Sequence, residues 1–444
     1  MSYYDLLETI NAEIAKCMKC GNCQAVCPIY KEDMAEWSVA RGKIKLAKDL
    51  LEGRLDYTPR IEEIFSLCLT CQACAENCPC GVRPDKIILA ARAAIAREKG
   101  LPTIKKYIFN VLKHPGQFKA GMRLGSTLQG FGLKKVNDTD FVKPRLPIGL
   151  DMRRVIRPLA PKSLLSQVSE VTPVENPKAR VVFFTGCMLN YIYTDAGHAV
   201  IKALTANDIE VITPKDQHCC GIPVIMSGDI ETARRIARYN IDVLSRYDCD
   251  AVITHCGTGI DAWVHHYPDL LENDPDYADK ARAFSEKAYD VSQYLVDRGG
   301  FRKPAAAMNR TVTYHDPCHM VRGVGVSTQP REVIQGIPGV TLKEMKKPDR
   351  CCGSAGSFSL THYALSSKIR DKKIADILAV SPDMVLTSCG ACRMQIEEGL
   401  YHAGCATPVH HVAELLASAY EKEETADKGN QRAHHKTAAQ MVAG

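Results

Sequence analysis

The 444-residue sequence lacks several features that would place it in other classes of protein. It has no run of 18 apolar residues, so we expect no transmembrane helix. Its first residues, MSYYDLLETINAEIAK, include acids and no apolar core, which argues against a secretory signal. No G-x-G-x-x-G follows a predicted strand, so neither a flavin site nor a nicotinamide site is expected in this chain. Aromatic residues are few and no nucleic-acid-binding motif is present, which argues against nucleic-acid binding.

Cysteine, in contrast, is abundant. The chain has 20 cysteines, and without an export signal these indicate metal and redox chemistry in a reducing compartment. Its 45% hydrophobic and 24% charged residues are typical of a globular protein. We therefore expect a cytoplasmic protein.

The N-terminal cysteines follow one spacing twice. Both copies read C-x2-C-x2-C-x3-C-P, the spacing with which bacterial ferredoxins hold two [4Fe-4S] clusters. Three thiolates two residues apart can bind three corners of a cube, while the fourth, placed before a proline, reaches the other cluster. A disulfide framework or a zinc ribbon would use cysteines in pairs and fits the double triplet poorly. We therefore assign one cluster to Cys17, Cys20, Cys23 and Cys78, and the other to Cys68, Cys71, Cys74 and Cys27.

Helical periodicity surrounds both motifs. Apolar residues recur at steps of three and four from Trp37 to Leu51, which predicts a helix that ends near Gly53. Further helices are predicted over 61–67 and 85–98. Residues 1–100 are therefore expected to form an all-helical ferredoxin domain with two clusters.

Two segments show no strong periodicity. Residues 101–175 are rich in Gly, Pro and basic residues and predict a long connector. Within it, residues 101–162 hold 13 Lys or Arg against three Asp, which indicates docking to an acidic partner, docking to anionic lipid at the inner face of the membrane, or a solvated surface. Residues 421–444 are polar and are expected to form a disordered tail in which His434 and His435 are solvated.

The chain repeats itself from about residue 178. Cys187, Cys219 and Cys256 recur as Cys318, Cys351 and Cys389, at offsets of 131, 132 and 133 residues. Each copy alternates apolar strands with amphipathic helices, which predicts parallel α/β layers with the cysteines at the carboxyl ends of the strands. The predicted strands are 180–185, 209–213, 251–254, 312–314, 340–343 and 384–387, and the predicted helices include 229–244 and 365–378. The expected fold is thus α+β and multidomain, with one repeat over 176–300 and a second over 301–420.

The two repeats differ in their thiols. The second repeat has five, and we expect them to bind a third iron–sulfur cluster: Cys318, Cys351, Cys352, Cys389 and Cys392. In the first repeat Gly259 occupies the position of Cys392. The first repeat is expected to hold zinc or a different cluster through its remaining thiols: Cys187, Cys219, Cys220 and Cys256. Gly221 and Gly353, in the two Cys-Cys-Gly segments, should allow positive φ or a close approach of the backbone.

Other histidines and cysteines lie outside these ligand sets. Four histidines flank the cysteines and are either ligands or hydrogen-bond partners of ligands: His218, His255, His315 and His319. Three cysteines fit no pattern and are expected to be small buried residues: Cys80, Cys249 and Cys405.

A double Cys-Cys-Gly repeat behind a helical two-cluster ferredoxin resembles the iron–sulfur subunit of glycolate oxidase and of related D-lactate and other 2-hydroxyacid dehydrogenase complexes. It also resembles the iron–sulfur subunit of anaerobic glycerol-3-phosphate dehydrogenase and the catalytic subunits of heterodisulfide reductase. The segments TYHDPCHM, RCCGSAGSFSL and SCGACRMQIEEGL are similar to those of the glycolate oxidase group. Over residues 10–420, the resemblance implies cubane ligation by the eight N-terminal cysteines and cluster binding by the five thiols of the second repeat. Gly259 departs from the five-cysteine pattern.

Three functions follow from these observations. In the leading hypothesis, a separate FAD-linked dehydrogenase oxidises a 2-hydroxyacid such as glycolate or lactate. This chain then passes the electrons singly to a quinone or other carrier and has no catalytic residue of its own for that oxidation. In the second hypothesis the chain reduces a disulfide at the second repeat, as the heterodisulfide reductase group does at a noncubane cluster. In the third, the repeats are a zinc-stabilised scaffold.

Overall fold

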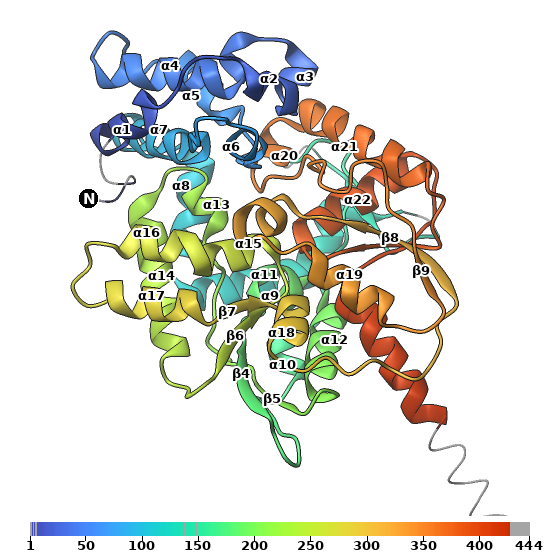
Figure 1. The fold of residues 1–444 in the computed structure, drawn as a ribbon. Helices are drawn as coiled ribbons and strands as arrows, with labels where there is room; N and C mark the ends of the chain where they lie inside the picture. The colour runs from blue at the N-terminus through green and yellow to red at the C-terminus, as the bar shows by residue number, and fades with distance from the viewer. Residues whose placement is uncertain (1, 3, 5–6, 137, 147–148, 427–444) are drawn as a thin grey trace, which may run out of the picture.

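The computed structural model describes residues 2, 4, 7–136, 138–146 and 149–426. The N-terminal helices, blue in Figure 1, lie across one end of two α/β units, the first green and yellow and the second orange and red. Among the described residues, no helix combines the length and the apolar character that a bilayer span requires.

The described residues before 133 form helices and no strand. As the apolar spacing predicts, α4 (Ala40–Leu51) buries one face, and it packs on α7 (Pro84–Lys99), which ends at Gly100. The shorter helices are η1 (Leu7–Ile10), α1 (Asn11–Ala15), α2 (Asn22–Val26), α3 (Tyr30–Asp33), η2 (Glu36–Ser38), α5 (Pro59–Ser66) and α6 (Ala73–Glu76).

The first repeat is built on a five-stranded sheet. Its strands lie in the order β3 (Val171–Thr172), β5 (Ile209–Ile212), β4 (Ala179–Phe183), β6 (Ala251–Thr254) and β7 (Ala288–Asp290), and all are parallel except β3. The central strands are apolar and buried, as expected of a parallel sheet covered on both faces. The helices of this repeat are α11 (Gly186–Tyr191), α12 (Thr194–Thr205), α13 (Ile222–Ile225), α14 (Ile230–Leu244), α15 (Gly257–Asp261), η3 (Ala262–His266), α16 (Tyr267–Leu271), α17 (Ala278–Glu286) and α18 (Val291–Asp297).

The second repeat has the same topology. Its parallel strands lie in the order β9 (Val340–Leu342), β8 (Arg310–His315), β10 (Met384–Thr387) and β11 (Val409–His410), which matches β5-β4-β6-β7 strand by strand. The duplication predicted from the cysteine spacing is therefore present in the sheets. The helices of this repeat are η4 (His319–Val324), α19 (Thr328–Gln335), α20 (Phe358–Thr361), α21 (Tyr363–Leu378) and α22 (Gly390–His402), and a last helix covers 412–426.

The predicted strands agree closely with the observed ones. The strands at 251–254 and 384–387 match to the residue, and the other four overlap β4, β5, β8 and β9. Five strands, β1 and β2 of the connector together with β3, β7 and β11, were not predicted because each is only two or three residues long, too short to show a pattern.

The connector is more regular than its sequence predicts. α8 (Thr103–Leu112) and α9 (Pro115–Gly132) form a helical hairpin, followed by the strand pair β1 (Leu133–Lys135) and β2 (Val142–Pro144) and by α10 (Leu164–Gln167). These two helices expose much of their apolar surface, and α9 is rich in glycine, which disfavours a helix and therefore predicted a loop here.

The last described helix continues into the segment predicted to be disordered. It covers 421–426, where Glu423 forms an ion pair with Arg302 at 2.8 Å. Tyr420, immediately before this segment, is fully buried, so the helix is held against the second repeat. The rest of the predicted tail, with His434 and His435, lies outside the described residues.

A buried ion network ties the connector to the second repeat. Glu398 on α22 is 0% exposed and forms ion pairs with Arg154 at 3.5 Å and Arg370 at 3.2 Å. It also accepts hydrogen bonds from the Val155 amide at 3.0 Å and the Tyr363 hydroxyl at 3.1 Å. Removing one member of such a network leaves buried charges without a counter-ion, which is costly.

We expect the variant Glu398→Ala to be strongly destabilised, because both arginines would then lose their carboxylate. The expected loss is about 3–5 kcal/mol of folding free energy. Thermal denaturation of the anaerobically purified protein should show a clear fall in melting temperature, while the exposed-site control Glu286→Ala should melt like the wild type. Equal melting of both variants would show that the network does not hold the connector.

Candidate metal centres

The eight N-terminal thiols gather in two groups in the structure. One cavity is lined by Cys17, Cys20, Cys23 and Cys78, and a second by Cys27, Cys68, Cys71 and Cys74. Each group combines three thiols of one motif with the last thiol of the other, and Cys74 and Cys80 also line the first cavity. Four thiols around one cavity form the donor set of a [4Fe-4S] cluster, so the residues present fit that group.

The backbone turns in the same way in both motifs. Lys19 and Gly21 have positive φ in the first motif, and Thr70 and Gln72 have positive φ at the equivalent positions in the second. Left-handed residues separated by one position coil the chain tightly and direct successive side chains inward. The three clustered cysteines of each motif thereby face one cavity.

Buried positive charge accompanies the second group of thiols. Burial raises the pKa of Cys27 to about 12, and it also raises the pKa of Cys74 above its usual value. Lys43 lines the same cavity, is fully buried and interacts electrostatically with Cys68 and Cys27. Its Nζ donates to the carbonyls of Ser38 and, at 3.3 Å, of Trp37. A fixed cation of this kind favours the thiolate form that metal binding requires.

Lys43 was not predicted from the sequence, yet a signal was available. It lies three residues after Ala40 and four before Ala47, on the buried face of α4. A lysine in an apolar stripe is unusual and indicates a nearby negative charge.

Arg92 fixes the second motif to the first repeat. Its guanidinium donates to the carbonyls of Phe65 at 2.8 Å, Cys68 at 2.7 Å and Met226 at 2.9 Å. Next to it, a Cβ on Gly228 would lie 2.4 Å from the Arg92 carbonyl oxygen, so only glycine allows this approach of the two backbones. The ferredoxin segment is thus locked onto the first repeat beside Cys68.

The second repeat brings its five thiols together. Cys318 follows β8 and Cys389 follows β10. These two strands are neighbours in the sheet, and the order of the strands reverses between them. That edge is the usual ligand position in doubly wound sheets. Side-chain contacts join Cys351 to Cys318 and to Cys352, Cys352 to Cys392, and Cys392 to Cys389. His315 Nε2 or Nδ1 completes a buried donor group with Cys352 and Cys392 in which all ligand atoms lie within 4.8 Å.

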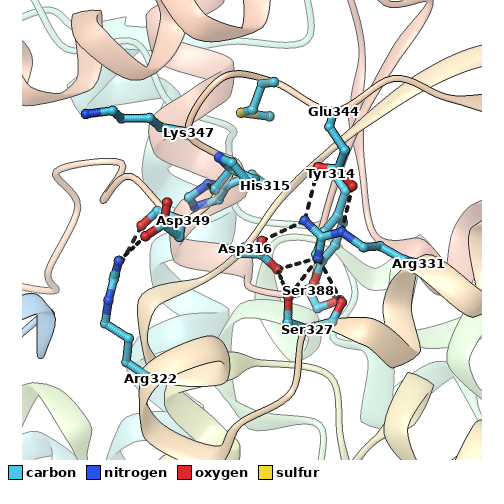
Figure 2. A network of polar contacts seen from close by, with 12 residues as sticks. Tyr314, His315, Asp316, Arg322, Ser327, Arg331, Glu344, Lys347, Asp349 and Ser388 are labelled. Atoms are coloured by element: carbon cyan, nitrogen blue, oxygen red, sulfur yellow. Dashed lines mark hydrogen bonds and ion pairs between the residues drawn. The ribbon is translucent and has the colours of Figure 1, made fainter. Parts of the chain in front are cut away.

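Polar contacts hold the loops around this site (Figure 2). Arg331 donates to both carboxylate oxygens of Asp316 at 2.8–2.9 Å and also to Glu344. Lys373 donates to the carbonyls of Lys347 at 2.6 Å and Pro348 at 3.0 Å. These contacts fix both the segment before Cys318 and the segment before Cys351.

The two Cys-Cys-Gly glycines have the predicted conformation. Gly221 has φ +78° and Gly353 has φ +84°. A Cβ on Gly353 would also lie 2.7 Å from the Ser366 carbonyl oxygen. The expectation of positive φ is confirmed at both glycines.

The first repeat gathers only three of its four thiols. Cys187 contacts Cys219, and Cys219 contacts Cys220. The contact with Cys219, together with burial, raises the pKa of Cys187. The Sγ of Cys256, which we expected beside these three, instead lies 3.7 Å from the Sγ of Cys389 in the second repeat. The reason is that β6 and β10 both end at the interface between the repeats.

The contacts across this interface are reciprocal. A Cβ on Gly257 would lie 3.1 Å from Pro317 Cβ, and a Cβ on Gly390 would lie 2.7 Å from Met188 Cβ. Gly257 and Gly390 are equivalent positions of the two repeats, and so are the segments that they touch. The repeats therefore face one another about an approximate two-fold axis that passes near Cys256 and Cys389.

One contact joins the ferredoxin thiols to the second repeat. The side chains of Cys71 and Cys351 interact, pack in one cluster with Cys318 and line the same groove. In consequence, thiols in mutual contact lead from the ferredoxin segment, through the second repeat, to Cys256 of the first.

The flanking histidines have different environments. His218 Nε2 is 2.6 Å from the Leu112 carbonyl oxygen, and His319 Nδ1 is 2.5 Å from Asp261, so each of these rings has a protein partner. His255 is buried, and neither ring nitrogen has a hydrogen-bond partner within the described chain. Of the unassigned cysteines, Cys249 is buried as expected, while Cys80 and Cys405 are half-buried.

Comparison with known proteins gives matches over the same segments. Residues 13–82 match the model of the 4Fe-4S dicluster domain, and residues 181–258 and 312–397 each match the Cysteine-rich domain. The two domain types thus coincide with the two kinds of thiol site.

Two of the relatives named here match almost the whole chain. The chain is 32% identical over 418 residues to the probable glycolate oxidase iron-sulfur subunit of Bacillus subtilis, covering 92% of this chain and 94% of that one. It is 28% identical over 419 residues to the glycolate oxidase iron-sulfur subunit of Escherichia coli, covering 92% and 94%. It is 28% identical to lactate utilization protein A of Bacillus cytotoxicus, covering 54% and 99%. The chain therefore belongs to the family of iron–sulfur oxidoreductase subunits that includes the glycolate oxidase iron-sulfur subunits.

Proposed function

We propose that this chain accepts electrons from a separate FAD-linked 2-hydroxyacid dehydrogenase and passes them to a quinone or another carrier. The contact between Cys71 and Cys351 carries the proposal, because it places ferredoxin thiols and thiols of the second repeat in one packed cluster that also contains Cys318. Relatives named for glycolate oxidase and lactate utilization support a 2-hydroxyacid as the partner's substrate.

We assign the ligands by the cavities that the thiols line. Two [4Fe-4S] clusters are held by the two crossed groups of four, and a third cluster by the five thiols of the second repeat, next to Cys256. When bound, such clusters supply one-electron redox chemistry. The chain's own contribution is to hold the donors in contact, to bury them, and to place Lys43 and Arg92 beside them.

The first repeat is proposed as a structural site. Its three mutually touching thiols, Cys187, Cys219 and Cys220, lie apart from the contact series through the second repeat. With Gly259 in place of a fifth thiol, this set suits zinc or a labile cluster. The alternative in which both repeats form only a zinc scaffold requires zinc at the second repeat as well.

A second function is supported by one observation. Cys351 is only half-buried and lines an open groove, so the second repeat can be reached from solvent. Disulfide reduction at this repeat is the enzymatic alternative. A further alternative is that this chain is the iron–sulfur subunit of an anaerobic glycerol-3-phosphate dehydrogenase. In that case the role of this chain is the same, and only the substrate of its partner differs.

We also propose that the α8–α9 hairpin docks at an anionic membrane surface. α8 exposes Ile104, Tyr107 and Ile108, and α9 exposes Leu124, Leu128 and Phe131, with exposures up to 80% at Phe131. Within each helix the spacing of three or four residues places these side chains in one stripe. The two helices carry basic residues and no acid, a combination typical of interfacial helices.

Three arginines of the connector contribute little to such a surface. Arg153 pairs with Asp151 at 2.8 Å, Arg157 pairs with Glu397 at 3.1 Å, and Arg154 is buried against Glu398. Reversing the charge of Arg154 or Arg157 would disturb the fold, so these residues cannot test docking.

Cys78→Ser is expected to damage the cluster whose other ligands are Cys17, Cys20 and Cys23, because Cys78 lines their cavity. Low-temperature EPR of the anaerobically purified variant should show loss or conversion of one of two interacting cubane signals. The single variants Cys27→Ser and Cys68→Ser should both change the other signal. If Cys78→Ser and Cys68→Ser alter the same cluster, the crossed assignment is wrong.

Cys351→Ser should abolish transfer of electrons from the flavoprotein to the acceptor while both cubane EPR signals remain, since Cys351 joins the second repeat to Cys71. Cys219→Ser should lower the melting temperature and leave transfer in the folded fraction near normal, because loss of a structural metal removes stability.

Iron near twelve atoms per chain supports a third cluster, whereas iron near eight with zinc supports the scaffold alternative.

Leu124→Glu/Phe131→Glu should weaken binding to phosphatidylglycerol-containing vesicles by about tenfold or more, because two anchoring side chains become charged. Vesicle sedimentation measures this, and binding of the wild type should also weaken as salt rises. The control Leu55→Glu/Leu360→Glu carries the same charge change at exposed leucines elsewhere. Vesicle binding that is equal for both double variants would exclude docking through the hairpin.

A further inference from the structure

A polar groove opens between the ferredoxin segment and the second repeat. It has a volume of about 540 Å³ and lies between α3 and α21. Cys71 and Cys351, the two thiols that join the two parts, both line it. The groove therefore gives access from solvent to the junction of two thiol sites.

Cations dominate the lining of this groove. Five basic residues from both walls line it: Lys31, Arg322, Lys347, Arg350 and Lys372. The acids that face the same space are Glu32, Glu76 and Asp349. Three of the cations are already engaged: Lys372 pairs with Glu32 at 2.5 Å, Arg350 with Asp376 at 3.0 Å, and Arg322 with Glu76 at 2.7 Å and with Asp349.

Two lysines remain without an acidic partner in the described part of the chain. Lys31 and Lys347 are exposed, and neither forms an ion pair there. In Figure 2 the ammonium group of Lys347 points away from the polar network around it. Partial burial and repulsion from Lys347, Arg350 and Lys372 lower the pKa of Lys31, so these cations lie close enough to repel one another. A bound anion would relieve that repulsion.

We propose that this groove binds a small redox-active anion, bearing carboxylate or phosphate groups, that exchanges electrons at the Cys71–Cys351 junction. The proposal rests on the electron-transfer function and adds to it the site and the charge of one redox partner. In the exchange, one electron passes from the reduced protein to the anion, and no bond is formed or broken and no proton is moved.

The dimensions of the groove favour a small molecule over a protein. Its volume lies within the range of roughly 300–1,000 Å³ that is usual for small-molecule sites. A stable protein interface needs roughly 800 Å² of surface from each partner, more than this confined lining offers.

Binding can be measured apart from electron transfer with hexacyanocobaltate(III), a trianion that does not accept electrons under these conditions. Calorimetric titration of the cluster-loaded protein should show one site, and Lys31→Glu/Lys347→Glu should weaken its Kd by about tenfold or more. The control Lys303→Glu/Lys346→Glu has the same net charge and changes exposed lysines that do not line the groove. Equal weakening in both double variants would mean that only overall charge matters, and would overturn the proposal.

Electron transfer is then tested with two oxidants of opposite charge. Protein reduced with dithionite, freed of excess reductant, is mixed in a stopped-flow instrument with ferricyanide or with hexaammineruthenium(III), each of which accepts one electron. The groove variant should react about tenfold more slowly with ferricyanide and no more slowly with hexaammineruthenium(III), relative to the control variant.

The outcomes separate this proposal from the function on which it rests. Hexacyanocobaltate binding that depends on the two lysines, with unchanged ferricyanide rates, would make the groove an anion site but not an electron port, and would overturn the proposal. If the anion does not bind, while the variant loses only its docking to the flavoprotein, the groove serves a protein partner and the proposal again fails. Loss of substrate-driven transfer in Cys351→Ser tests the broader function independently.

Discussion

Sulfur that is buried and must carry negative charge is the constraint on which this structure depends. Burial opposes ionisation, as the raised pKa values of Cys27 and Cys74 show. Fixed cations such as Lys43, whose own burial costs folding free energy, offset part of this penalty, and bound iron would offset the rest. Cofactor loading is therefore expected to be coupled to folding, and each part of the chain is organised around a group of thiols.

The same thiols account for the assembly of the three parts. The ferredoxin segment meets the second repeat where Cys71 touches Cys351, and the two repeats meet where Cys256 touches Cys389. Arg92 and the close approach at Gly228 secure the ferredoxin segment to the first repeat. Because the contacts between parts lie at the thiol sites, movement of one part relative to another would disturb the spacing of the redox groups.

The sequence carried much of this arrangement in short-range signals. Spacing between cysteines indicated the crossed pairing of motifs and the duplication, and apolar runs located strands such as Ala251–Thr254 to the residue. What it could not supply depends on long-range geometry. The pairing of Cys256 with Cys389 arises only when the two repeats are packed together, and no local pattern records that packing. α9 was missed because its glycines predict a loop, and the burial of Lys43 was missed because the charge that explains it lies elsewhere in the fold.

The reciprocal contacts about the approximate two-fold axis have an evolutionary consequence. Gly257 and Gly390 touch equivalent segments, as corresponding residues do in a symmetric pair of subunits. A homodimer whose gene was duplicated and fused would leave such an interface, with two copies of one ancestral thiol facing one another as Cys256 and Cys389. Fusion frees each half to change alone, since a substitution no longer appears on both sides of the axis. Gly259, which stands where the second repeat has Cys392, is a one-sided difference of this kind, and in a dimer of identical chains it would appear on both sides.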